Sequence, residues 1–311
     1  MIRPYRPRIL SPLREGVAAE TFGRPRGRLP RDAPRRSPCL QGCYGKRAKL
    51  RKEIEMEHHI IKGEKVPSLG LGTWRLSGDK CARAVQRALE LGYRHIDTAQ
   101  IYGNEEQVRQ GIQNAGVDRE EIFLVTKVWT SSFSYKRTIE STRESLRKLG
   151  TDYVDLLLMH WPNPSVLLEE TLGAMTELQN EGSVRHVGVS NFSPFMVEEA
   201  ARYATVFCNQ VEYHPYKVQD ELLEQATETD YLLTAYRPIA KGDVLEDHTL
   251  REIGKAHGKT PVQVALRWLI QQEKVAAIPK ATSEEHLRGN LDVFDFDLSD
   301  EEMGRIFGLR R

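Results

Sequence analysis

The sequence predicts a (β/α)8 barrel, the TIM-barrel fold, on the strength of three observations. Eight short apolar runs alternate with eight amphipathic stretches between residues 69 and 279, which is the rhythm of repeated strand-helix units. Most of these runs are apolar at nearly every position, as parallel strands buried on both faces are. The main alternative, an open doubly wound sheet, would carry Gly-x-Gly-x-x-Gly after its first strand, whereas the first run here has only Gly70-Leu-Gly72.

The expected strands are short runs rich in Val, Ile, Leu and Ala, each bounded by turn signals. In chain order they are Leu69–Trp74, His95–Ala99, Ile122–Trp129, Tyr153–His160, His186–Asn191, Val206–Val211, Leu232–Tyr236 and Val275–Pro279.

The expected helices carry apolar residues at helical spacing. They are Lys80–Leu91, Glu105–Asn114, Tyr135–Leu149, Val166–Asn180, Pro194–Tyr203, Glu221–Thr229, Leu250–His257 and Pro261–Gln271. Gly150 directly follows Leu149, and glycine there is a common stop because it readily adopts the left-handed conformation that ends a helix. Thr260 before Pro261 is a good start, since the hydroxyl can cap a helix whose first position tolerates proline.

Charge divides the chain of 311 residues into two parts. Residues 1–55 carry 15 Lys and Arg against five Asp and Glu, whereas residues 56–311 carry 30 against 39. The first part is rich in Arg, Pro and Gly and lacks apolar periodicity, so we expect it to be disordered and the barrel to span residues 56–311. We interpret residues 1–55 as an extension foreign to the natural protein, with a targeting peptide or a basic interaction tail as alternatives.

The composition argues against several classes of function. The acidic balance of residues 56–311 disfavours general nucleic-acid binding, which needs a concentrated basic face. No stretch is long and apolar enough to cross a membrane, and no secretory signal is expected. Cys39 and Cys43 have no second Cys or His pair nearby, so no metal site is expected, while Cys81 and Cys208 are predicted to be buried thiols in a reducing compartment. We therefore expect a cytoplasmic monomer.

Polar and aromatic side chains recur at the carboxyl ends of the expected strands, where barrel enzymes place their reactive groups. Packing alone does not account for such residues at one rim of an otherwise apolar strand set, so we predict the active site there. The set is Thr73, Trp74, Asp97, Lys127, Trp129, His160, Trp161, Ser190, Asn191, Gln210, Tyr236 and Lys280.

Several of these residues belong to longer motifs. The motifs are Gly92-Tyr-Arg-His-Ile-Asp-Thr-Ala99 with Tyr102-Gly-Asn-Glu105, Val125-Thr-Lys127, Leu158-Met-His-Trp-Pro162, Gly188-Val-Ser-Asn-Phe192, Asn209-Gln-Val-Glu-Tyr-His-Pro215 and Ile278-Pro-Lys280. With these motifs in this order, residues 60–309 resemble the aldo-keto reductases, and among them the short prokaryotic members related to 2,5-diketo-D-gluconic acid reductases. The resemblance implies an NADPH-dependent oxidoreductase that reduces aldehydes and ketones to alcohols, with NADH as a second candidate cofactor.

The resemblance also assigns four catalytic residues. Tyr102 would protonate the carbonyl oxygen while the nicotinamide supplies hydride. Because a free tyrosine has a pKa of about 10, Lys127 would be needed to make this phenol more acidic, and Asp97 would keep Lys127 protonated and aimed. His160 would donate a hydrogen bond to the carbonyl oxygen. Taken singly, Asp97 and Lys127 could equally form a structural ion pair and His160 a core histidine, but their occurrence at one rim favours catalysis.

Cofactor and substrate contacts follow from the same resemblance. Tyr236 would stack on the nicotinamide, unless it is a core tyrosine, and Lys280 would bind the adenosine 2′-phosphate and so favour NADPH. Ser190, Asn191 and Gln210 suit the carboxamide. The other expected cofactor contacts are Gly72, Thr73, Arg237, Pro238, Ile239, Thr282, Ser283, His286 and Asn290, and the expected substrate contacts are Trp74, Trp129, His160 and Trp161.

Three positions among the expected cofactor contacts depart from the pattern of the family. His286 stands where a second phosphate-binding arginine is usual and Gly289 where an acidic adenine contact is usual, so NADPH selectivity is expected to be weaker than typical. Arg237 stands where serine is more common and would add a phosphate contact. The alternative functions are a nucleotide-binding regulatory subunit of the same fold with little turnover, and a scaffold without a cofactor.

Overall fold

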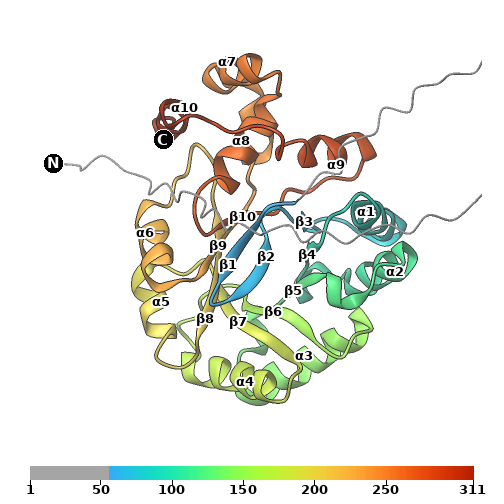
Figure 1. Ribbon diagram of the computed structural model, residues 1–311. Helices are drawn as coiled ribbons and strands as arrows, with labels where there is room; N and C mark the ends of the chain where they lie inside the picture. The colour runs from blue at the N-terminus through green and yellow to red at the C-terminus, as the bar shows by residue number, and fades with distance from the viewer. Residues whose placement is uncertain (1–55) are drawn as a thin grey trace, which may run out of the picture. The chain divides into compact units, whose positions relative to one another are not determined.

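Eight parallel strands form one sheet in the order β10-β9-β8-β7-β6-β5-β4-β3 in the computed structural model, which describes residues 56–311 (Figure 1). The strands are β3 Leu71–Gly72, β4 His95–Asp97, β5 Phe123–Val128, β6 Val154–Met159, β7 Val184–Ser190, β8 Val206–Glu212, β9 Leu232–Tyr236 and β10 Val275–Ala277. The disorder and the alternative roles considered for residues 1–55, and the cysteine pair Cys39 and Cys43, lie outside the described residues.

Backbone hydrogen bonds between the first and last strands close this sheet into a barrel. Leu69 forms a parallel bridge with Ala277, and the amides of Gly70 and Gly72 donate to Ala277 and Pro279 at 2.8 and 3.1 Å. A Cβ on Gly72 would lie 2.7 Å from the carbonyl oxygen of Ile278, so glycine permits the two strands to approach. The predicted (β/α)8 barrel is confirmed.

Helices surround the barrel, and each of the eight predicted helices is present. They are α1 Gly78–Glu90, α2 Glu105–Ala115, α3 Tyr135–Leu149, α4 Leu168–Asn180, α5 Pro194–Ala200, α6 Asp220–Thr229, α7 His248–His257 and α8 Pro261–Ile270. The largest boundary error lies at the end of α5, which was expected to reach Tyr203. After Ala200 the amides of Arg202 and Tyr203 bond three residues back rather than four, so the chain tightens into turns there.

A two-stranded hairpin that was not expected from the sequence precedes the barrel. Strands β1 (His58–Ile61) and β2 (Glu64–Pro67) pair antiparallel around Lys62 and Gly63, which both have positive φ. The hairpin crosses the front of the barrel in Figure 1. Ile61 and Val66 are fully buried in one cluster with apolar side chains of the barrel interior. The hairpin therefore closes the amino-terminal end of the barrel.

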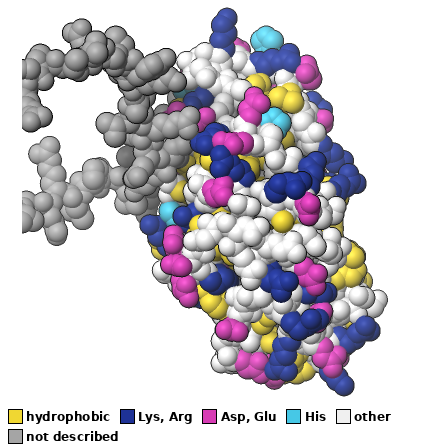
Figure 2. All heavy atoms as spheres, turned by 90° about the vertical axis from the view of Figure 1, so that its right-hand side faces the viewer, with side chains coloured by type: hydrophobic (Ala, Val, Ile, Leu, Met, Phe, Trp, Pro, Cys, Tyr) yellow, Lys and Arg dark blue, Asp and Glu magenta, His cyan; other side chains and the backbone are white. Residues whose placement is uncertain are grey.

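Two helices beyond the eight repeats were also missed, α9 (Glu284–Leu291) and α10 (Asp300–Phe307). Phe307 of α10 packs edge-on against buried Trp268 of α8, with ring centroids 5.0 Å apart. Arg87 of α1 pairs with Glu284 of α9 at 2.7 Å. Figure 2 views the side of the molecule that lies on the right in Figure 1, where Lys, Arg, Asp and Glu side chains are interspersed over the surface.

Two further expectations concern cysteine and the membrane. Cys81 in α1 and Cys208 in β8 are both buried and unpaired with each other, as predicted. Among residues 56–311 no helix combines the length and the apolar character needed to cross a membrane.

Candidate active site

A cavity of about 1170 Å³ opens at the carboxyl ends of the barrel strands, and we call it the rim cavity. Its size is slightly above the range of about 300–1,000 Å³ that small-molecule sites occupy. Fifteen of the predicted site residues line it: Gly72, Trp74, Asp97, Tyr102, Trp129, His160, Trp161, Ser190, Asn191, Gln210, Tyr236, Arg237, Pro238, Ile239 and Lys280. The predicted residues that do not line it are Thr73, Lys127, Thr282, Ser283, His286 and Asn290.

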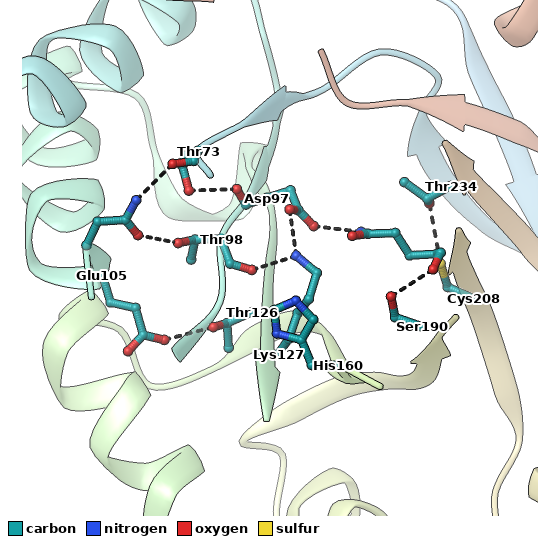
Figure 3. Close-up of polar contacts among 12 residues, drawn as sticks. Thr73, Asp97, Thr98, Glu105, Thr126, Lys127, His160, Ser190, Cys208 and Thr234 are labelled. Atoms are coloured by element: carbon teal, nitrogen blue, oxygen red, sulfur yellow. Dashed lines mark hydrogen bonds and ion pairs between the residues drawn. The ribbon is translucent and has the colours of Figure 1, made fainter. Parts of the chain in front are cut away.

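A buried ion pair lies beneath the rim cavity, with Asp97 reaching its lining (Figure 3). Lys127 on β5 is fully buried, and its ammonium donates to Asp97 Oδ1 at 2.6 Å and to the carbonyl of Thr98 at 2.9 Å. The second carboxylate oxygen of Asp97 accepts a hydrogen bond from Gln210 at 2.8 Å. Burial is the largest single effect and disfavours the charged lysine, but the attraction and hydrogen bonding of Asp97 and Tyr102 together outweigh it and raise the Lys127 pKa. Lys127 therefore carries a positive charge at neutral pH.

Tyr102 lies beside this ion pair in the short 3-10 helix η1 (Gln100–Tyr102). The Lys127 Nζ atom is 5.2 Å from the centroid of the Tyr102 ring. Lys127 acts on this phenol in the expected direction, because its ammonium lowers the Tyr102 pKa, but the net pKa lies above that of a free tyrosine. Burial raises the Tyr102 pKa, and the nearby ammonium offsets that effect only in part. At neutral pH Tyr102 is a protonated donor.

His160 follows β6 and faces Tyr102 across the cavity. The two rings meet edge-on with centroids 5.6 Å apart, and the indole of Trp129 packs edge-on against the imidazole at 5.2 Å. Burial, with a smaller contribution from the charge of Lys127, lowers the His160 pKa to about 3, so the imidazole is neutral. Its Nδ1 atom is buried without a hydrogen-bond partner among the described residues.

Four predicted cofactor residues form one hydrogen-bonded group on the opposite wall. Ser190 at the end of β7 donates to the carbonyl of Gln210 at 2.7 Å, and Asn191 donates to Ser190 Oγ at 3.0 Å. The Tyr236 hydroxyl donates to Asn191 Oδ1 at 2.8 Å, which leaves the ring half-buried at the cavity wall. Asn191 has a φ of 65°, a left-handed conformation in which asparagine is well tolerated. The group thus presents amide and hydroxyl atoms beside an aromatic face.

Arg237, expected to contact a phosphate, is bonded to a carboxylate. It follows β9, and its Nη1 atom donates to Glu212 at 3.1 Å. Its guanidinium carbon lies 5.2 Å from the Trp74 ring centroid. The guanidinium carbon of Arg75 lies 4.3 Å from the same centroid. Trp74 therefore contacts two cations at the mouth of the cavity.

The remaining predicted cofactor residues follow β10, on the segment that leads into α9 and on α9 itself. Lys280 is exposed and lines the rim, whereas Thr282 and Ser283 follow it on the surface. Ser283 caps α9 by accepting a hydrogen bond from the amide of His286 at 3.2 Å. Asn290 is buried and contributes a hydrogen bond to the Tyr93 hydroxyl. The structure thus brings Lys280 to the cavity but not Asn290.

Asn104 lies in the motif Tyr102-Gly-Asn-Glu105, but no role was expected for it from the sequence. Asn104 is fully buried and donates to the carbonyls of Thr73 and Leu76, each at 3.0 Å, and accepts from Thr98 Oγ1 at 2.7 Å. Thr73 donates its hydroxyl to the carbonyl of Asp97 at 3.0 Å. The position of Asn104 two residues after the expected acid, within the motif, was the only signal that could have identified it as the residue whose hydrogen bonds hold this loop.

The comparisons with known proteins agree with this geometry. Residues 68–311 match the model of the aldo/keto reductase family. The glyoxal reductase of Bacillus subtilis is 39% identical over 255 residues, which are 81% of this chain and 92% of that protein. The methylglyoxal reductase DkgB of Salmonella typhi is 41% identical over 249 residues, 78% of this chain and 93% of that protein.

Solved structures give the same result. A crystal structure provisionally named 2,5-diketo-D-gluconic acid reductase B is 48% identical, with a TM-score of 0.81, over 83% of this chain and 93% of that one. An aldo/keto reductase from Brucella melitensis is 41% identical, with a TM-score of 0.78, over 82% of this chain and 100% of that one. The chain therefore belongs to the aldo/keto reductase family and is an oxidoreductase that uses a nicotinamide cofactor to reduce small carbonyl compounds.

Proposed function

We propose that this enzyme uses NADPH to reduce aldehydes and ketones, with Tyr102 as the proton donor. The observation that carries the proposal is the buried pair of Lys127 and Asp97 beneath a phenol that faces a neutral imidazole. A packing role alone would not require an ammonium, a phenol and an imidazole to meet at the floor of one cavity.

In the proposed reaction, each residue acts on the carbonyl oxygen or on the proton donor. A bound reduced nicotinamide supplies the hydride. Tyr102 donates its proton to the oxygen as negative charge develops there, and the ammonium of Lys127 stabilises the phenolate that remains. His160, as a neutral imidazole, can donate one hydrogen bond and orient the carbonyl. Asp97 keeps Lys127 charged and is itself held by Gln210.

The residues present fit a dinucleotide. The half-buried ring of Tyr236 offers a stacking face, and Ser190, Asn191 and Gln210 offer amide and hydroxyl groups for a carboxamide. Towards the outside, Arg237 and Lys280 give the rim positive charge suited to phosphates. Lys280 is the residue that we assign to the 2′-phosphate of NADPH, with Thr282, Ser283, His286 and Asn290 nearby in sequence and NADH as a weaker alternative.

We assign the substrate to small carbonyls, 2-oxoaldehydes among them. Three tryptophans, Trp74, Trp129 and Trp161, line the outer part of the cavity around Tyr102 and His160. The relatives named glyoxal reductase and methylglyoxal reductase support this class. We also propose a cytoplasmic monomer, in keeping with the unoxidised buried thiols of Cys81 and Cys208.

The principal test is Tyr102→Phe, assayed by NADPH consumption with methylglyoxal and with 4-nitrobenzaldehyde. We expect kcat to fall by roughly two to four orders of magnitude, because general-acid catalysis is worth about that much. NADPH binding, followed by quenching of tryptophan emission, should change little. The control is Tyr203→Phe, which removes a hydroxyl from an exposed ring on the outer surface.

Near-normal turnover by Tyr102→Phe would contradict the assignment of the acid. Binding of NADPH by the wild-type enzyme without turnover on a panel of carbonyls would favour the regulatory subunit instead. Absence of quenching by either dinucleotide would favour the scaffold.

For the cofactor, Lys280→Ala should raise the KM for NADPH roughly tenfold or more while changing that for NADH little, since only NADPH carries a 2′-phosphate. The control is Lys136→Ala on the outer face of α3, where the lysine is 84% exposed. Equal effects of Lys280→Ala on the two cofactors would remove the phosphate role.

A further inference from the structure

The ion pair between Glu212 and Arg237 joins two neighbouring barrel strands at the mouth of the rim cavity. Glu212 ends β8 and Arg237 directly follows β9, and both line the cavity. Arg237 Nη1 lies 3.1 Å from Glu212 Oε1, and the two side chains are 33% and 21% exposed. The pair is thus partly shielded from water and lies on the wall where the cofactor phosphates are assigned.

The backbone conformation of Arg237 and two neighbouring aromatic rings orient its side chain toward the cavity. Its φ is 51°, a left-handed conformation that is strained for a residue with a Cβ. Its guanidinium carbon lies 5.2 Å from the Trp74 ring centroid and 5.9 Å from that of Tyr236. A guanidinium has five N–H donors, and within residues 56–311 its hydrogen bond to Glu212 uses one of them. The group is therefore placed to bind a second anion.

Glu212 does not depend on Arg237 alone. Its other carboxylate oxygen lies 3.1 Å from the ammonium of Lys217, and the imidazole of His214 approaches Oε1 at 4.0 Å. Burial favours the neutral acid, but the hydrogen bonds from Arg237 and Lys217 outweigh it and lower the Glu212 pKa, so this carboxylate is ionised at neutral pH. Separating a shielded ion pair is costly mainly because it strands a charge. Here Lys217 would remain with Glu212, so the departure of Arg237 would not leave the carboxylate without a cation.

We propose that Glu212 competes with the cofactor diphosphate for the guanidinium of Arg237. Glu212 holds this group while the diphosphate is absent and releases it when the diphosphate binds. The competition weakens cofactor binding and speeds cofactor release, which each catalytic cycle requires. This inference rests on the proposed function, because it takes the ligand of the rim cavity to be a dinucleotide.

The competition predicts that Glu212→Gln strengthens cofactor binding. Glutamine keeps the length and the accepting oxygen but loses the charge, so it holds the guanidinium by a hydrogen bond without the added attraction between opposite charges. Arg237 would then transfer to the diphosphate more readily. We expect the Kd for NADPH to fall roughly threefold to tenfold, chiefly through slower dissociation.

The experiment measures NADPH binding to the cofactor-free protein by quenching of tryptophan emission, and NADPH dissociation by stopped flow. Four proteins are compared, namely wild type, Glu212→Gln, Arg237→Gln and the double variant. Glu221→Gln is the control, since Glu221 is exposed in the same cavity and has no ion pair with Arg237 in the described part of the chain. The gain in affinity should appear in Glu212→Gln, be absent in Glu221→Gln, and vanish when Arg237 is already Gln.

Unchanged or weaker binding by a folded Glu212→Gln would overturn the inference, and so would an equal gain in the Arg237→Gln background. If Glu212→Gln does not fold, Lys217→Met decides in its place. That change removes the ammonium that would remain with Glu212 after Arg237 departs. NADPH should therefore bind more weakly to Lys217→Met, but only when Arg237 is present. An equal loss of affinity in the Arg237→Gln background would overturn the inference. Failure of the wild-type protein to bind either dinucleotide would instead overturn the proposed function.

Discussion

Tyr102 and His160 lie at the floor of the same cavity, and burial fixes the protonation state of both. Burial raises the pKa of the phenol and lowers that of the imidazole to about 3. Both groups are therefore neutral hydrogen-bond donors over the range in which enzymes are usually assayed. Among Tyr102, His160 and Lys127, only Lys127 is charged. Its ammonium lies 2.6 Å from Asp97 Oδ1, which helps to keep it protonated.

The pH dependence of carbonyl reduction should reflect this environment. A histidine with its ordinary pKa of about 6.5 would produce an inflection between pH 6 and 7. Because the His160 pKa is about 3, kcat for the reduction should be flat from pH 5 to 9. It should fall only as the pH rises through the Tyr102 pKa, which lies above the ordinary tyrosine value and above which the acid has lost its proton. The measurement is kcat with saturating NADPH and 4-nitrobenzaldehyde across this range.

An inflection near pH 6.5 that disappears in His160→Gln would show that the imidazole titrates and would contradict this account. The control for buffer effects is the Kd for NADPH at the two ends of the range.

At the scale of elements, the wall that carries Ser190 and Asn191 depends on an irregularity between β7 and β8. The register of the two strands shifts between Val187 and Val189, and Gly188 lies at the shift. A Cβ on Gly188 would lie 2.5 Å from the carbonyl oxygen of Cys208 and 2.8 Å from Leu158 Cδ2. Glycine therefore lets the strands approach just before the residues assigned to the carboxamide.

Gly188→Ala should destabilise the protein by about 1–3 kcal/mol, the usual cost of overpacking a buried position. The KM for NADPH should rise as well, because the displaced strand carries Ser190 and Asn191. Gly289→Ala in α9 is the matched control, since a Cβ there meets nothing within 4 Å. Urea unfolding of both variants measures the difference, and an equally stable Gly188→Ala would show that β7 and β8 can separate without cost.

At the scale of the whole molecule, two histidine side chains join the hairpin to the strands at the amino-terminal end of the barrel. His59 of β1 hydrogen-bonds the carbonyl of Val275 at 2.7 Å, and buried His95 of β4 contacts the carbonyl of Pro67 at 3.3 Å. Burial lowers the pKa of His59 to about 4 and also lowers that of His95. These groups join His160 as histidines that the fold holds neutral.

Neutral buried histidines make the folded state sensitive to acid. Below the unfolded pKa of about 6.5 the unfolded chain binds protons that the folded state does not, so the stability of the fold decreases as the pH falls. The urea midpoint should therefore be lower at pH 5 than at pH 7. His59→Gln keeps a side-chain amide that can donate to Val275 but cannot titrate, and it should reduce this difference. Equal midpoints of the wild type at the two pH values would contradict the prediction.

The sequence by itself determined the eight strand-helix repeats and the rim at which the polar residues gather. Both depend on local information, since apolar spacing and glycine stops set the elements and the direction of parallel strands places their carboxyl ends together. The assigned roles of Asp97, Tyr102, Lys127 and His160 came from motifs that span only a few residues each.

Only the tertiary structure decided the net direction of the Tyr102 pKa, the bonds of Asn104 and the capture of Arg237 by Glu212. A pKa depends on how far burial outweighs a neighbouring charge, and that balance requires distances between residues remote in sequence. The hairpin under the barrel was missed for the same reason, because Ile61 and Val66 become core residues only when the barrel closes above them. Local pattern sets which elements form, whereas burial and approach across the fold set what their side chains do.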